Sequence, residues 1–229
     1  TRKESSAASD VYKRQHQKKF PFLSMDIEQV FQNYVYKKKV FPSQRSTQFG
    51  GIAIERNNMR MYNCTASYID RVRFFAEGFW LLMSGCGVGF SVQKHHIAKL
   101  PALISKDQRD SRLKKIHVVE DSIEGWAEAV HVLTKSYLPS SEDEAKYCIN
   151  FHYDQVRPEG SPISIGGVAP GPRVLEVAIE KVRSILDQAV DQAQDKLRPI
   201  QCFDMFMHIS HAALLSSRRA ATIALFSPD

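Results

Sequence analysis

The sequence predicts an α/β fold, because short β-prone segments alternate with amphipathic helices along the chain. The clearest unit is Met61–Gln93, in which a β-prone piece ending at Cys64 leads to a helix, a glycine-rich turn and a second β-prone segment. The chain has 229 residues, of which 43% are hydrophobic, and this is enough for a buried core.

The helix within this unit is predicted from the spacing of its apolar residues. Five apolar side chains recur at intervals of three and four residues, as on a helix packed against a sheet: Val72, Phe75, Phe79, Leu82 and Met83. Asp70 is expected in the first turn, where a carboxylate complements the helix N-terminus. Gly85 is expected to end the helix.

The turn that follows contains Gly85, Gly87 and Gly89. Glycine adopts positive φ and lets a ligand approach the backbone closely. The run has neither the Lys-Ser/Thr ending of a P-loop nor the GxGxxG spacing of a dinucleotide-binding turn. It is therefore equally compatible with a structural turn and with a nucleotide contact. A single cysteine such as Cys64 is more often a small buried residue than a reactive thiol.

Further elements are expected on both sides of this unit. A helix is predicted over residues 25–38, and the strongly charged residues 106–115 are expected to be exposed. Asp121 and Glu124 have the spacing of a capping box, which predicts the start of another helix.

A glycine- and proline-rich loop covers residues 154–172. Loops of this length within a compact domain tend to be functional, and backbone amides that open onto a helix N-terminus can hold a phosphate. Pro172 suits the first position of the helix that follows, and Pro199 precedes another helix. The last apolar run, Thr222–Phe226, predicts a buried strand.

The composition excludes several classes of protein. The formal net charge is +6, but Ser5–Gln15 resembles the translation of a sequencing-library adapter, so residues 1–15 are expected to be a disordered artefact. Residues 16–229 are expected to form one partial domain. The other basic residues are scattered, so no nucleic-acid partner is expected. No apolar run is long enough to span a membrane. Four cysteines without CxxC spacing indicate a reducing cytoplasm and predict no metal site.

Several segments together resemble the large subunit of ribonucleotide reductases, and most closely the adenosylcobalamin-dependent (class II) ribonucleoside-triphosphate reductases. The segments occur in the family's order and cover most of the chain after Tyr36. They are VFPSQR (Val40–Arg45), MYNC (Met61–Cys64), LLMSGCGVGFSVQ (Leu81–Gln93), VVEDSIEGWAEA (Val118–Ala129), VRPEGSPI (Val156–Ile163), GGVAPGP (Gly166–Pro172) and SSRRAATIALFSPD (Ser216–Asp229).

The resemblance implies the N-terminal part of a ten-stranded α/β barrel, truncated, with the radical cysteine and the second redox cysteine beyond Asp229. It implies reduction of ribonucleoside triphosphates to 2′-deoxyribonucleoside triphosphates by thiyl-radical chemistry. Adenosylcobalamin would be the cofactor, although its binding residues are not identifiable in this chain. The fragment alone is expected to be inactive.

The resemblance also implies roles for individual residues. Cys64 matches the N-terminal cysteine of the redox pair that reduces the ribose 2′ position, and Asp70 resembles an effector-binding carboxylate. Gly85, Gly87 and Gly89 resemble the turn behind the substrate and effector sites. The remaining substrate- and effector-binding residues implied by the family are Gly166, Gly167, Gly171, Ser217, Arg218, Arg219 and Thr222.

The partners implied in this way are a ribonucleotide substrate, a deoxynucleotide or ATP effector and a thioredoxin-type reductant. Two alternatives remain open at the level of sequence. One is the large subunit of a class I ribonucleoside-diphosphate reductase. The other is a nucleotide-binding regulatory module without catalytic activity.

Overall fold

The computed structural model describes residues 2–41, 43–163, 168–215 and 221–228, and its contacts divide the chain into two compact units. The first unit is Thr1–Asn63 and the second is Cys64–Asp229. The division differs from the single domain over residues 16–229 that the sequence predicts. It leaves all the predicted site residues in the second unit.

The first unit is helical in its described part. Its first helix, α1 (Arg2–Lys19), covers most of the segment that is expected to be a disordered artefact. The hydroxyl of Tyr36 donates to the Asp10 carboxylate, and Lys13 forms an ion pair with Glu28 at 3.0 Å. These contacts hold α1 against the segment that follows. The other helices are η1 (Pro21–Leu23), α2 (Ser24–Val30), the π-helical turn η2 (Phe31–Val35), α3 (Gln44–Phe49), α4 (Ile52–Arg56) and η3 (Asn58–Met61).

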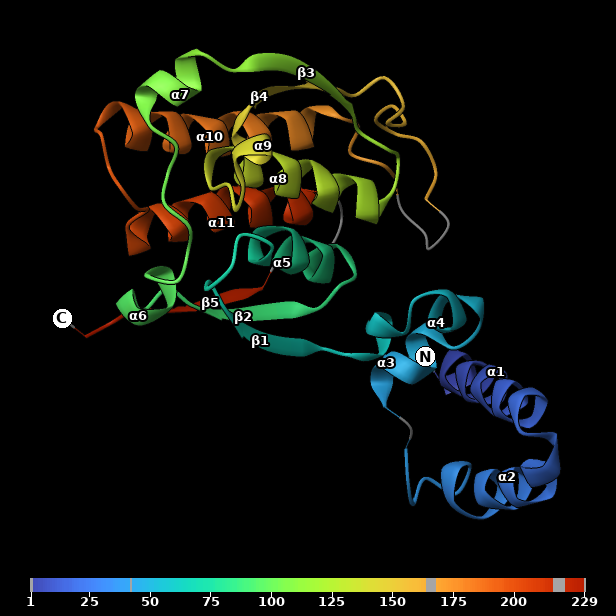
Figure 1. The fold of residues 1–229 in the computed structure, drawn as a ribbon. Helices are drawn as coiled ribbons and strands as arrows, with labels where there is room; N and C mark the ends of the chain where they lie inside the picture. The colour runs from blue at the N-terminus through green and yellow to red at the C-terminus, as the bar shows by residue number, and fades with distance from the viewer. Residues whose placement is uncertain (1, 42, 164–167, 216–220, 229) are drawn as a thin grey trace. The chain divides into compact units, whose positions relative to one another are not determined.

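The second unit contains a parallel three-stranded sheet in the order β1-β2-β5 (Figure 1). Strand β1 (Cys64–Tyr68) begins at Cys64, whereas the sequence places the end of a strand there. The pairing explains the difference, because Cys64 lies opposite Gly87 at the start of β2 (Gly87–Ser91). Strand β5 (Thr222–Leu225) pairs with the other edge of β2.

Helices α5 (Phe74–Met83) and α11 (Pro199–Leu215) lie on one side of this sheet (Figure 1). All five positions of the predicted apolar stripe of α5 are buried. The helix begins later than expected, so Asp70 precedes it rather than lying in its first turn. The α5 backbone approaches α11 at Gly78, where a Cβ atom would lie 2.5 Å from Cε2 of Phe206.

A second parallel sheet joins β3 (Leu113–Val118) to β4 (Tyr147–His152). The sequence predicts only an exposed charged segment over residues 106–115, and β3 is exposed at most of its positions. Helices α8 (Ile123–Tyr137) and α10 (Arg173–Asp191) lie between this pair and the helices on the first sheet (Figure 1). The remaining helices of the unit are α6 (Lys94–Ile97), α7 (Lys106–Asp110) and α9 (Glu142–Ala145).

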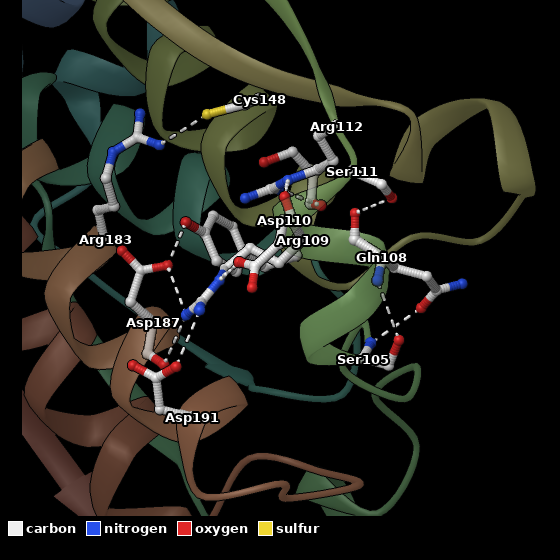
Figure 2. Close-up of polar contacts among 12 residues, drawn as sticks. Ser105, Gln108, Arg109, Asp110, Ser111, Arg112, Cys148, Arg183, Asp187 and Asp191 are labelled. Atoms are coloured by element: carbon white, nitrogen blue, oxygen red, sulfur yellow. Dashed lines mark hydrogen bonds and ion pairs between the residues drawn. The ribbon is translucent and has the colours of Figure 1, made fainter.

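Arg109 joins α7 to α10 (Figure 2). Its guanidinium lies 2.9 Å from Asp191 and 3.7 Å from Asp187, and the hydrogen bond to Asp191 is the largest contribution that raises its pKa. The hydroxyl of Tyr137, from α8, donates at 2.7 Å to Oδ1 of Asp187, the same oxygen that lies near Arg109. This network connects the three helices α7, α8 and α10.

The N-terminus of α8 is capped differently from the prediction. The hydroxyl of Ser122 accepts a hydrogen bond from the backbone N–H of Gly125 at 2.9 Å, so Ser122 is the N-cap. Asp121 instead forms an ion pair with Arg157 at 2.6 Å. The sequence spacing of Asp121 and Glu124 predicts the correct helix and the wrong capping residue.

This difference has a measurable consequence. Ser122→Ala is expected to lower the free energy of unfolding by about 1 kcal/mol, because an orphan amide loses its acceptor. Asp121→Ala removes an ion pair that is partly exposed to solvent, so it is expected to cost no more than about 1 kcal/mol and to lose its effect at high salt. Urea denaturation of both variants at low and high salt compares them. A larger cost for Asp121→Ala that does not depend on salt would restore Asp121 as the cap.

The sequence predicts that the last strand is buried and that no segment spans a membrane. Strand β5 is not buried, because the side chain of Ile223 is 79% exposed and that of Leu225 is 57% exposed. These side chains alternate with Thr222 and Ala224, which face the helices, so the strand is covered on one face only. In the described ranges, no helix combines the length and apolar character needed to cross a membrane.

Candidate functional site

The predicted site residues on strands β1, β2 and β5 can be assigned to one of the two faces of the sheet. Side chains alternate between the faces of a strand, and paired residues of parallel strands point to the same face. Val88 and Phe90 are buried among the helices, so they mark the helix-facing side. The opposite face is formed by the alternate positions Cys64, Ala66, Tyr68, Gly87, Gly89, Ser91, Ile223 and Leu225, and it is open except at Ser91, which is buried.

Cys64 lies at the amino-terminal end of this open face and is exposed. Its neighbour on β2 is Gly87, which has no side chain to cover the thiol. The alternation therefore places an accessible thiol beside bare backbone. The interpretation of Cys64 as a buried apolar residue is thus wrong.

Gly89 extends this bare surface along the central strand. A Cβ atom there would lie 3.6 Å from the carbonyl oxygen of Thr65 and 3.7 Å from Cβ of Ala66, which are ordinary contact distances. Gly89 lies in regular strand, so the backbone does not require glycine. Neither packing nor conformation requires glycine at this position, so the backbone of the central strand is bare there and open to close approach.

Two of the other predicted glycines have structural reasons. Gly85 follows α5 with φ of +88°, and the backbone N–H groups of Gly85 and Cys86 donate to Leu82 and Leu81, as at a helix C-terminus. Gly171 has φ of +74°, and a Cβ atom there would lie 3.0 Å from the backbone nitrogen of Glu159. The local fold therefore requires glycine at both positions.

The structure separates the remaining described site residues. Asp70 follows the carboxyl end of β1 and forms an ion pair with Arg71 at 2.7 Å. Thr222 lies at the amino end of β5, near the level of Cys64, but its hydroxyl contacts the sulfur of Met207 on α11 at 3.9 Å. Thr222 therefore belongs to the helix-facing side. Cys64, Gly87 and Gly89 are the predicted residues that share the open face.

The other predicted residues are Gly166, Gly167, Ser217, Arg218 and Arg219, which lie outside the described residues. Backbone hydrogen bonds are described on both sides of Gly166 and Gly167. The N–H of Gly160 donates to the carbonyl of Ala169, and the N–H of Ala169 donates to the carbonyl of Ser161. Pro162 and Val168 form an antiparallel bridge. The described parts of the predicted loop thus run alongside each other, ahead of α10.

Sequence reasoning missed a polar cluster at the carboxyl end of the open face. Nδ1 of His96 lies 2.9 Å from the hydroxyl of Ser91, and the ring of His96 lies 4.5 Å from that of Tyr68. Burial lowers the pKa of His96, and the nearby charges of His95 and Lys99 lower it further. The alternation of side chains along a strand could have indicated Tyr68, because it lies four residues after Cys64 and therefore on the same face.

The described residues contain no group of three or more histidine, cysteine or acidic side chains arranged to hold a metal ion. Three cavities of the second unit measure about 380, 500 and 520 Å³. Each is too small to enclose a corrin ring with its axial groups. The residues around these cavities therefore do not form an adenosylcobalamin site by themselves.

Comparison with known proteins gives a consistent set of relatives, although no family model matches the chain. An adenosylcobalamin-dependent ribonucleoside-triphosphate reductase of Levilactobacillus brevis is 26% identical over 182 residues, which cover 66% of this chain and 24% of that protein. The enzyme of the same name from Lactobacillus helveticus is 25% identical over 260 residues, which cover 90% of this chain and 34% of that protein. A probable enzyme of this kind from Dictyostelium discoideum is 29% identical over 119 residues, which cover 50% of this chain and 14% of that protein.

A solved structure agrees with these relatives. The crystal structure of a B12-dependent (class II) ribonucleotide reductase matches with a TM-score of 0.74 and 21% identity, over 91% of this chain and 35% of that one. The chain spans about a quarter of the length of the L. brevis relative, of which 24% is covered. Its resemblance to the adenosylcobalamin-dependent ribonucleotide reductases is confirmed in sequence, and its fold is that of the matching part of a class II enzyme.

Proposed function

We propose that the protein containing this chain reduces ribonucleoside triphosphates to 2′-deoxyribonucleoside triphosphates. One observation carries the proposal: an exposed thiol, Cys64, lies beside a central strand that is bare at Gly87 and Gly89. A glycine that is required by neither backbone nor packing leaves room for a sugar to lie against the sheet beside the thiol. The names of the relatives support the choice of substrate.

In this proposal Cys64 supplies one of two thiols to the reaction. The ribose C2′–OH bond is replaced by C2′–H, the oxygen leaves as water, and the two thiols become a disulfide. The two electrons thus come from sulfur, and an external dithiol of the thioredoxin type must restore the thiols. Adenosylcobalamin, when bound to the whole protein, would supply the radical that starts the reaction.

The remaining predicted residues take supporting roles. We assign substrate and effector contacts to the turn Gly85–Gly89 and to Asp70. We assign effector contacts, for a deoxynucleotide or ATP, to Gly166, Gly167 and Gly171, and to the segment of Ser217, Arg218, Arg219 and Thr222. Arginine side chains recognise phosphates and stack on bases. All four cysteines are free thiols, and this supports activity in the reducing cytoplasm.

The bare strand gives a test that separates function from folding. Gly89→Val is expected to lower turnover of the full-length protein at least about tenfold, because the new side chain would stand on the open face opposite Ala66, next along the strand from the Cys64–Gly87 pair. The melting temperature is expected to stay within a few degrees, since valine suits a strand and its Cβ atom meets only ordinary contacts. The assay measures deoxynucleotide formation from a ribonucleoside triphosphate with dithiothreitol, with and without adenosylcobalamin.

A matched control changes the same face at its far side. Leu225→Ala removes an exposed side chain on β5 and is expected to retain most of the activity. Full activity of Gly89→Val would show that the bare strand is not needed for the reaction and would contradict the proposal. Turnover that does not need adenosylcobalamin would assign the protein to another class of ribonucleotide reductase.

A further inference from the structure

The second sheet has a free edge at β3. The sheet consists of only β3 and β4, and β3 lies at the margin of the second unit (Figure 1). No residue of β3 belongs to the site described above, so the inference that follows does not depend on the proposed function.

The backbone groups of β3 point alternately toward β4 and away from it. The N–H of Leu113 donates to the carbonyl of Lys146, next to β4, at 2.9 Å. Since successive residues of a strand direct their backbone groups to opposite sides, the N–H and C=O groups of Lys114, Ile116 and Val118 point away from β4. These are the groups that a further strand would pair with.

The two edges of this sheet differ in what already contacts them. Arg183 of α10 donates from Nη2 to the carbonyl oxygen of Ile149 at 2.6 Å, so a helix engages the outer edge of β4. The outward groups of β3 have no hydrogen-bond partner among the described residues. A row of unpaired backbone groups on an edge strand is a template for another extended segment.

The side chains of β3 are exposed on the face that carries the free edge. Ile116 is 60% exposed and Val118 is 44% exposed, and they share this face with Lys114. Lys115 lies on the other face, with its ammonium group 5.1 Å from the ring centre of Tyr147. Neither lysine forms an ion pair with another described residue. The edge therefore combines apolar surface with two positive charges that lack a carboxylate.

This charge distinguishes between the possible occupants of the edge. A second copy of the chain would bring two more lysines to the same place, and lysine on an edge strand disfavours such pairing. Carboxylates opposite Lys114 and Lys115 would instead form favourable cross-strand pairs. The chain does not supply them itself, because Asp110 pairs with Arg109 at 3.0 Å and Glu120 lies beyond the end of the strand.

We propose that the free edge of β3 binds an extended, acidic peptide segment of another protein as an added strand. The peptide would place acidic residues opposite Lys114 and Lys115 and apolar residues opposite Ile116 and Val118. Its backbone would pair with the outward groups of β3, in the antiparallel direction that gives the slightly more stable ladder.

Fluorescence anisotropy with a blocked, labelled peptide tests the proposal on the 229-residue chain. The sequence Ser-Val-Thr-Val-Glu-Glu-Val-Ser has the required pattern, and saturable binding is expected. Lys114→Glu and Lys115→Glu are each expected to weaken it at least about fivefold. Lys181→Glu changes an exposed lysine on α10 and is the matched control, with no expected change. The same peptide with lysine in place of glutamate is expected not to bind.

A proline variant tests the strand pairing itself. Ile116→Pro removes one outward N–H but no bond to β4, so it is expected to weaken binding at least about tenfold while circular dichroism verifies the fold. Unchanged binding by this variant would overturn strand addition, and unchanged binding by both glutamate variants would overturn the acidic partner. Absence of saturable binding to the folded chain would overturn the proposal as a whole. A dimer in sedimentation equilibrium that Ile116→Pro dissociates would assign the edge to a second copy instead.

Discussion

Phe206→Ala is expected to lower the free energy of unfolding of this chain by about 3–5 kcal/mol, the usual cost of removing a fully buried aromatic ring. Phe206 has no exposed surface, and its ring lies 5.0 Å from that of Phe74 and 4.8 Å from that of Phe90. It therefore joins α11 to α5 and to the helix-facing side of β2. Loss of this ring leaves a cavity among groups that are already packed.

Urea denaturation followed by circular dichroism measures the effect. Phe206→Leu keeps most of the volume and is expected to lose less, so it gives a measurable value if the alanine variant does not fold. Tyr62→Ala removes a 58% exposed ring in the first unit and is the control for a general effect of aromatic loss. Equal stability of Phe206→Ala and the unmodified chain would contradict the packing described here.

Gly78 provides a second test of the same contact. Gly78→Ala is expected to destabilise the unmodified chain by about 1–3 kcal/mol, because the new methyl group would overlap the ring of Phe206. In the Phe206→Ala background the same change is expected to be neutral or to stabilise by up to about 1 kcal/mol, since alanine is the better helix former. Additive effects in the double-mutant cycle would show that the two residues do not meet.

Cys64→Ser is expected to abolish repeated turnover of the full-length protein with a dithiol reductant, lowering the rate at least about 100-fold because a hydroxyl cannot form the disulfide. The exposed position of Cys64 predicts a small effect on stability, within about 0.5 kcal/mol. The measurement is deoxynucleotide formation over many turnovers, together with a thermal melt of the same preparation.

Cys148→Ser is the matched control for this variant. Cys148 is only partly exposed and lies on β4, where its sulfur is 3.9 Å from the guanidinium of Arg183 (Figure 2). It belongs to the other sheet, so this variant is expected to retain activity. Unchanged turnover of Cys64→Ser would refute the role of Cys64, and loss of activity in both variants would indicate a general sensitivity to thiol removal.

The sequence predicts much of the fold because apolar periodicity reports directly which helical face is buried. The stripe from Phe75 to Met83 and the helix after Pro199 both correspond to buried helices. Strand β3 escaped prediction because its exposed, lysine-rich residues do not alternate. Its pairing with β4, which lies far along the chain, supplies the hydrogen bonds that its own composition does not predict.

The candidate site divides in a similar way. Residue types alone predict that a thiol, a carboxylate and several glycines match the motifs of the family, because a local motif can be recognised without its surroundings. Only the tertiary structure showed which of the glycines are required by the local fold and which are not. Gly85 and Gly171 are required by positive φ, while Gly89 is required by neither conformation nor packing.

The sequence by itself thus determined the α/β class, the main helices and the residues by which the chain resembles ribonucleotide reductases. The tertiary structure decided which of those residues share a surface. Strand register places Cys64, Gly87 and Gly89 on one open face and turns Thr222 to the other. The physical reason is that register depends on hydrogen bonds between segments far apart in the chain, which local sequence does not encode.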